Sequence, residues 1–95
     1  MTVSLFAQHK VEDFATWKKL FDETAPQALD RGGVIEKAVH RNLDNPNEVI
    51  VYHKFADVET LNAFMNSLQD DHFQEFAQAS GVILDSMTMW VGEDV

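Results

Sequence analysis

Apolar and polar residues alternate at the start, in the middle and near the end of the chain, over residues 3–9, 34–55 and 84–92. A period of two is typical of β-strands, whose successive side chains point to opposite faces. The middle stretch is divided by Asp44-Asn45-Pro46-Asn47. Proline fixes φ and the Asp and Asn side chains bond to nearby backbone, so this segment predicts a turn between strands 34–43 and 48–55. The alternation therefore predicts four strands, two of them in a hairpin.

Between the first strand and the hairpin, apolar residues recur every three or four positions, which predicts an amphipathic helix. Asp13 is the expected N-cap and Gly32-Gly33 the expected end, because glycine adopts the C-terminal conformation readily. Pro26 is expected to kink or restart this helix, because it has no N–H. The expected buried stripe consists of Phe14, Trp17, Leu20, Phe21, Ala25 and Ala28.

A second helix is predicted after the hairpin, with Asp57 as its N-cap. Residues 67–71 are polar and leave two alternatives open. In a continuous helix His72 would face the sheet, whereas in a helix that restarts at Asp70 or Asp71 it would lie on the flank. Gly81 is expected to end this region. The apolar stripe consists of Val58, Leu61, Phe64, Met65 and Leu68, followed by Phe73, Phe76 and Ala77.

The order of elements is β-α-β-β-α-β in one domain of residues 1–95. Right-handed connections place the first and third strands in the centre of a four-stranded antiparallel sheet with two helices on one face, which is the ferredoxin-like α+β arrangement. The other face would carry Phe6, Tyr52 and Trp90. An exposed aromatic patch usually marks an interface, so we expect these residues to contact a second copy in a homodimer.

Composition narrows the classes of partner. The net charge is −9, which disfavours nucleic acid and anionic membranes as partners. Cysteine is absent, so disulfides and thiolate chemistry are excluded, and we expect a cytoplasmic protein. The chain shows no glycine-rich phosphate loop, no histidine pair at metal-ligand spacing on a helix, and no other metal or cofactor motif. We therefore expect neither a metal nor a cofactor.

Four histidines are the main candidates for chemistry. His9 and His40 come late in parallel strands and should lie toward one end of the sheet, whereas His53 lies toward the other. His53 is our candidate catalytic residue, as a proton-transfer group on the inward face; the alternative is a structural imidazole bonded to the backbone. Residues expected to line a ligand pocket are His9, Trp17, Phe64, His72 and Phe73, and plain packing is the alternative for the aromatic ones.

Two segments carry a family resemblance: His9–Asp22, with the sequence HKVEDFATWKKLFD, and Asp44–Val49, with the sequence DNPNEV. In order and spacing they resemble small dimeric α+β-barrel proteins, the superfamily of the antibiotic biosynthesis monooxygenase-like proteins. The resemblance implies a homodimer with a pocket between helices and sheet in each subunit. The haem-degrading branch pairs a first-strand asparagine with a tryptophan and a helix histidine. The first strand here offers Gln8 and His9, so that site is not carried over.

These observations leave different classes of function open. One is a cofactor-free monooxygenase, isomerase or cyclase acting on an apolar or aromatic compound. Another is a dimer that binds such a ligand without turnover. The last is a structural dimerisation domain whose aromatic residues all lie in the core and the interface.

Overall fold

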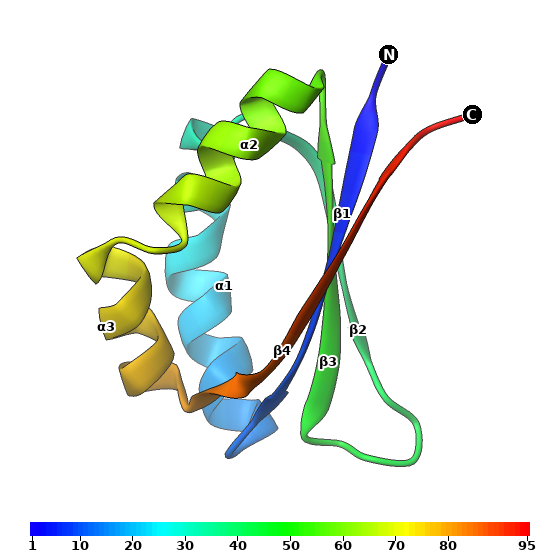
Figure 1. The fold of residues 1–95 in the computed structure, drawn as a ribbon. Helices are drawn as coiled ribbons and strands as arrows, with labels where there is room; N and C mark the ends of the chain where they lie inside the picture. Colours follow the sequence, from blue (N-terminus) through cyan, green and yellow to red (C-terminus); the bar gives the residue numbers. More distant parts are fainter.

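The computed structural model describes all residues, Met1–Val95, and has the predicted α+β architecture. The strands are β1 (Val3–Val11), β2 (Val34–Arg41), β3 (Glu48–Phe55) and β4 (Val82–Glu93). They form one antiparallel sheet in the order β2-β3-β1-β4, so the first and third strands are central, as predicted. The helices are α1 (Phe14–Arg31), α2 (Val58–Ser67) and α3 (Asp71–Ser80). Figure 1 shows all of them on one side of the sheet, with the other side uncovered.

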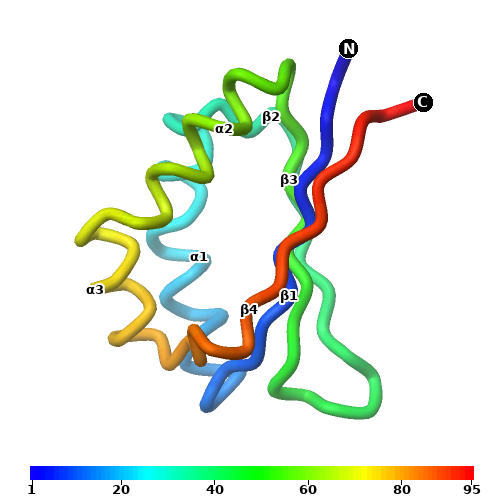
Figure 2. Tube along the Cα trace, viewed as in Figure 1, coloured from blue at the N-terminus to red at the C-terminus, as the bar shows by residue number.

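Capping side chains determine where each helix begins. Asp13, Asp57 and Asp70 are the N-caps of α1, α2 and α3, and each carboxylate accepts a backbone N–H from the first turn. The cap at Asp70 separates α3 from α2, so the predicted second helix is two helices. Figure 2 shows the chain turning between them. None of the helices combines the length and apolar character that a membrane crossing requires.

The stripe predicted for α1 is wrong near its end. Helix α1 continues through Pro26 without restarting, and its buried residues are Trp17, Phe21, Ala25 and Leu29. Ala28 is exposed. The buried positions follow a spacing of four, which moves the stripe onto Leu29 by the last turn.

The β2–β3 hairpin is anchored to the start of α1. β2 ends at Arg41 rather than at residue 43, because the Asn42 Oδ1 accepts the backbone N–H groups of Asp44 and Asn45 and starts the turn early. Within the turn, Asn47 Oδ1 accepts the N–H of Phe14 (3.1 Å). The Arg41 guanidinium lies 4.6 Å from the Phe14 ring centroid. The hairpin therefore helps to position the first turn of α1, from which Trp17 projects.

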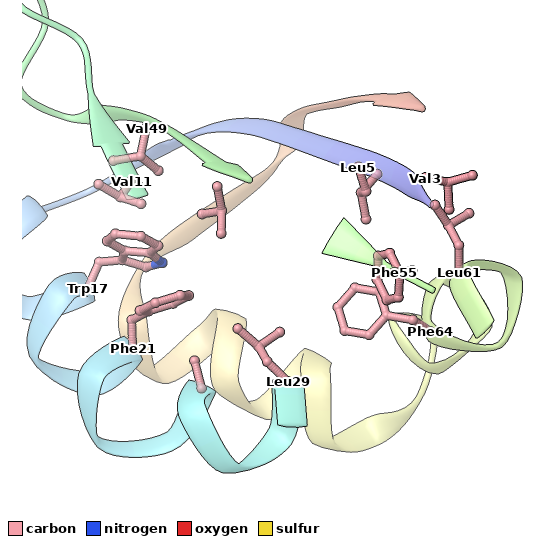
Figure 3. Close-up of a cluster of buried hydrophobic side chains, with 12 residues drawn as sticks. Val3, Leu5, Val11, Trp17, Phe21, Leu29, Val49, Phe55, Leu61 and Phe64 are labelled. Carbon is pink, nitrogen blue, oxygen red and sulfur yellow. The ribbon is translucent and has the colours of Figure 1, made fainter. Parts of the chain in front are cut away.

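The core lies between the sheet and the helices. Alternate residues of β1 and β3 point toward α1 and α2 and are buried. Figure 3 shows strand residues such as Leu5 and Phe55 facing helix residues such as Phe64. The same pattern of alternation brings His9 of β1 and His53 of β3 into this layer. Two imidazoles therefore lie among apolar side chains.

Candidate functional site

The structure separates the histidines into two buried and two exposed ones. His9 and His53 are 5% and 6% exposed. His40 and His72 are exposed. The helix break is the alternative that the structure shows, so His72 lies on the flank at the start of α3 and does not face the interior. His72 therefore does not line a pocket between the helices and the sheet, contrary to the prediction.

The two buried histidines lie at opposite ends of the core, as predicted. His53 pairs with Leu5 across the sheet, four positions before His9 on β1. At about 3.4 Å per residue, this places their Cα atoms roughly 14 Å apart along the strand. The predicted pocket residues therefore divide between two places. Trp17 accompanies His9, Phe64 accompanies His53, and the half-buried Phe73 of α3 joins neither ring pair.

The His53 end of the core is aromatic. The ring of His53 lies 5.4 Å from that of Phe64 and 6.5 Å from that of Phe55, centroid to centroid. Burial lowers the pKa of His53 from 6.5 to about 4, outweighing the opposite effect of its backbone hydrogen bond. Nδ1 lies 3.4 Å from the carbonyl oxygen of Leu5. Because a carbonyl only accepts, Nδ1 carries the proton, and His53 is neutral near pH 7.

The His9 end of the core pairs this imidazole with an indole. The rings of His9 and Trp17 meet edge to face with centroids 5.6 Å apart. Burial also lowers the pKa of His9, and its Nδ1 lies 3.4 Å from the carbonyl oxygen of Lys10. The same reasoning gives a neutral ring with its proton on Nδ1. Nε2 therefore carries a lone pair that can accept a hydrogen bond.

Trp17 contributes a donor without an acceptor. Its side chain is 1% exposed, and Nε1 is the only buried side-chain nitrogen or oxygen without a hydrogen-bond partner. In Figure 3 this nitrogen lies on the edge of the ring that is turned toward the middle of the core cluster. Leaving a buried N–H unpaired costs about 1–3 kcal/mol, so such a group in a native protein calls for an explanation. The helical spacing predicted a core or pocket position for Trp17, but nothing in the sequence indicated the free donor.

The inner side of β4 is only partly covered. Met89 pairs with Ala7, and Val91 pairs with Leu5, on the face that the helices cover elsewhere. Yet Val91 is 44% exposed, and Met87 and Met89 are only half-buried. Methionine is flexible and fills irregular space, so this side of the core can rearrange more readily than the β1–β3 side.

Two of the hollows on the surface adjoin the core, and no histidine lines either of them. A shallow one of about 420 Å³ lies between the end of α1 and β2, around Pro26, Leu29 and Ile35. A smaller one of about 200 Å³ lies between the start of α2 and the end of β4, around Val58, Leu61 and Val91. No group of three or more His, Asp or Glu side chains is placed to hold a metal ion.

The uncovered face of the sheet carries the predicted aromatic residues. The Phe6 ring lies 5.2 Å from that of Tyr52 and 5.8 Å from that of Trp90, centroid to centroid. Trp90 is 63% exposed. Its indole covers Gly92, where an added Cβ would come within 2.4 Å of the ring. These rings form one patch across β3, β1 and β4 on the face away from the helices.

Comparison with solved structures shows where this fold occurs. An antibiotic biosynthesis monooxygenase family protein from Bordetella bronchiseptica, described as putative, is 16% identical with a TM-score of 0.75, covering 99% of this chain and 97% of that one. A similarly described protein from Caulobacter crescentus is 16% identical with a TM-score of 0.76, covering 99% and 90%. SnoaB from Streptomyces nogalater, described as a cofactor-independent oxygenase, is 22% identical with a TM-score of 0.64, covering 96% and 88%. At these identities the likeness concerns the fold.

The comparison with curated proteins found no match. The sequence itself matches one family model, described as antibiotic biosynthesis monooxygenase, over residues 1–79. The matched part includes β1, the hairpin and all but the last residue of the helices. The chain therefore belongs to the antibiotic biosynthesis monooxygenase family.

Proposed function

We propose that the protein oxygenates a small, mainly apolar or aromatic compound without a cofactor, and that the compound is held by a hydroxyl group between Trp17 and His9. The observation that carries this proposal is the buried N–H of Trp17, which has no protein acceptor and belongs to an indole that meets the neutral imidazole of His9 edge to face. Family membership and the fold shared with SnoaB support the reaction class.

A hydroxyl group is complementary to this pair. Its oxygen accepts the N–H of Trp17 while its O–H donates to Nε2 of His9. The surrounding side chains of Phe14 and Phe21 suit an aromatic ring. The flexible inner side of β4, with Met87 and Met89, is the route by which we expect the compound to enter.

Such a pair also suits oxygenation of a phenolic compound. Transfer of the hydroxyl proton to Nε2 of His9 leaves an electron-rich anion, stabilised by the Trp17 N–H. The anion forms a carbon–oxygen bond with O₂ at a ring CH position, giving a hydroperoxide once a proton returns. Loss of water from the hydroperoxide leaves a carbonyl group. One oxygen atom of O₂ then lies in the product and the other in water.

The catalytic role predicted for His53 passes to His9 in this proposal. A general base works best with a pKa near the working pH, and His53, with a pKa of about 4, is a weak base at pH 7. It also lies among aromatic rings without a free donor beside it. We assign His53 to packing.

Ligand binding without turnover is the second candidate. It is favoured by the lowered pKa of His9, which makes this imidazole a weaker base than a free one. A donor and an acceptor suffice for binding, whereas oxygenation needs the proton to move.

The test combines binding and O₂ uptake. A panel of phenols and hydroquinones is titrated against the protein by NMR, and O₂ consumption is followed in an electrode without flavin and with a chelator present. We expect Trp17→Phe to weaken binding roughly 2- to 13-fold, the value of one net hydrogen bond. We expect His9→Gln to abolish O₂ uptake. Trp90→Phe and His40→Gln change the same residue types outside the core, Trp90 conservatively on the opposite face of the sheet, and are the matched controls.

Each outcome decides between the candidates. Binding with O₂ uptake that depends on His9 supports the oxygenase. Binding that depends on Trp17 but brings no uptake overturns the oxygenase in favour of the binding protein. If no phenol in the panel binds, or if the exposed controls lose as much as the buried variants, the site assignment is wrong.

We also propose that the protein is a homodimer that buries the patch of Phe6, Tyr52 and Trp90 against a second copy. The patch is supported as an interface by the contact of its three rings with one another, by the exposure of Trp90 and by the absence of any element of this chain over it. Sedimentation at micromolar concentration is expected to give twice the chain mass, and Trp90→Ala is expected to shift the protein toward monomer. A parent that sediments at one chain mass would rule the dimer out.

A further inference from the structure

The ladder between β1 and β4 is interrupted beside His9. Gln8 pairs with Thr88, and Lys10 pairs with Ile83. Between these pairs lie one residue on β1, His9, and four on β4, Leu84–Met87, so β4 bulges outward there. β-Bulges are common next to functional sites, where they redirect a side chain or end a pairing.

Ser86 holds the bulge in place. Its Oγ accepts the backbone N–H of Lys10 (2.8 Å) and donates to the carbonyl oxygen of Ile83 (2.5 Å). The hydroxyl thus replaces the backbone carbonyl that would accept from Lys10 in an uninterrupted ladder. It joins the two strands at the point where their backbones separate.

The peptide group held by Ser86 is adjacent to the one that orients His9. The carbonyl oxygen of Lys10 accepts a hydrogen bond from Nδ1 of His9 (3.4 Å). The backbone N–H of Lys10 donates to Oγ of Ser86. The two groups belong to rigid peptide units that meet at the Lys10 Cα, so fixing the N–H of one unit restricts the rotations that would turn the carbonyl of the other. The chain of contacts therefore runs from Ser86 through Lys10 to the His9 ring.

We propose that Ser86 is a positioning residue that keeps the proton of His9 on Nδ1, through the backbone of Lys10, and so keeps Nε2 free as the acceptor for a ligand. The role of Nε2 in this inference rests on the proposed function. The effect of Ser86 on the tautomer of His9 does not, and it can be measured without any ligand. The peptide group that carries the Lys10 carbonyl is also held by its Val11 N–H, which donates to the carbonyl oxygen of Asn47 (2.8 Å). Without the Ser86 hydroxyl only this second anchor remains, so the carbonyl can tilt and the ring can carry its proton on either nitrogen.

The test compares two side chains of equal shape. Ser86→Thr keeps the hydroxyl and Ser86→Val replaces it by a methyl group. The tautomer of His9 is read from the ¹⁵N chemical shifts of its ring nitrogens at pH 7. We expect the parent and Ser86→Thr to show the Nδ1–H form. In Ser86→Val the ratio of Nδ1–H to Nε2–H should fall by about fivefold, the factor of one ordinary net hydrogen bond.

A serine elsewhere provides the control. Ser67 donates to the carbonyl oxygen of Phe64 at the end of α2, so Ser67→Ala also removes one hydroxyl hydrogen bond but should leave the His9 tautomer unchanged. A Ser86→Val protein with the parental tautomer ratio would overturn the proposal. If the ratio falls while the parent binds no phenol, the positioning role stands and the proposed function fails. If the parent binds a phenol and the ratio is unchanged, the reverse holds.

Discussion

The buried imidazole of His53 should make the protein sensitive to mild acid. Its pKa is lowered to about 4 in the folded chain, against 6.5 as the ordinary value. Between these values the unfolded state binds more protons than the folded state, so the free energy of unfolding falls as the pH falls. The contribution of neutral His53 to the free energy of unfolding is fully present above pH 6.5 and is lost as the pH falls from 6.5 to 4.

The structure sets the size of this effect. A difference of about 2.5 pH units corresponds to about 3 kcal/mol, of which about 2 kcal/mol is lost by pH 5. A chain of this length has a urea m-value of about 1 kcal/mol per molar, so the unfolding midpoint should move by about 2 M between pH 7 and pH 5 because of His53 alone. That is a large part of the 5–15 kcal/mol that stabilises a typical domain.

The assay compares the parent with His53→Gln, whose amide still can donate to the Leu5 carbonyl. Other groups also titrate, including His9 and the capping Asp13 and Asp57, whose pKa values are lowered. Their contributions are common to both proteins and cancel when the two are compared at the same pH and protein concentration. We expect the midpoint of His53→Gln to fall about 2 M less than that of the parent, whereas His40→Gln should follow the parent. Parallel loss of stability in the parent and in His53→Gln would refute the reasoning.

Three further predictions concern packing and capping. Asp70→Ala removes the N-cap of α3 and should lower the free energy of unfolding by about 1 kcal/mol, measured by urea denaturation. Leu29→Ala should cost about 2–5 kcal/mol in the same assay, because the side chain is buried in the last turn of α1; a cost under 1 kcal/mol would contradict its place in the core. Gly92→Ala should displace the indole of Trp90, since the added Cβ would lie 2.4 Å from that ring. In a Trp17→Phe background the emission of Trp90 should then shift, with little loss of stability; an unchanged spectrum would contradict the contact.

Local patterns predicted the elements well where they reflect backbone chemistry. Asp13 and Asp57 are caps because a short carboxylate reaches the free N–H groups of the first turn, and this depends on only a few neighbouring residues. β3 has the predicted bounds because its β-branched residues and the turn before it act locally. The burial of His53 also followed from alternation, since residues two apart share a face.

Other features could not be predicted from the sequence, because they depend on residues far away in the chain. A change of phase between Val82 and Met87 was the available sign of the bulge, yet alternation alone favoured a shorter strand beginning at residue 84. The bulge exists because Ser86 bonds to Lys10, which is remote in sequence. Likewise, nothing near Trp17 shows that its N–H lacks an acceptor, because that depends on every strand packed around it.

The sequence by itself determined the order of the strands, the caps at Asp13 and Asp57, the single layer of helices and the aromatic face, since periodicity and capping act within a few residues of the chain. The tertiary structure decided which side chains meet. It removed His72 from the interior and brought the indole of Trp17, whose N–H has no acceptor, edge to face with the imidazole of His9. Strand register and packing create those relations, and both arise only when segments distant in sequence come together.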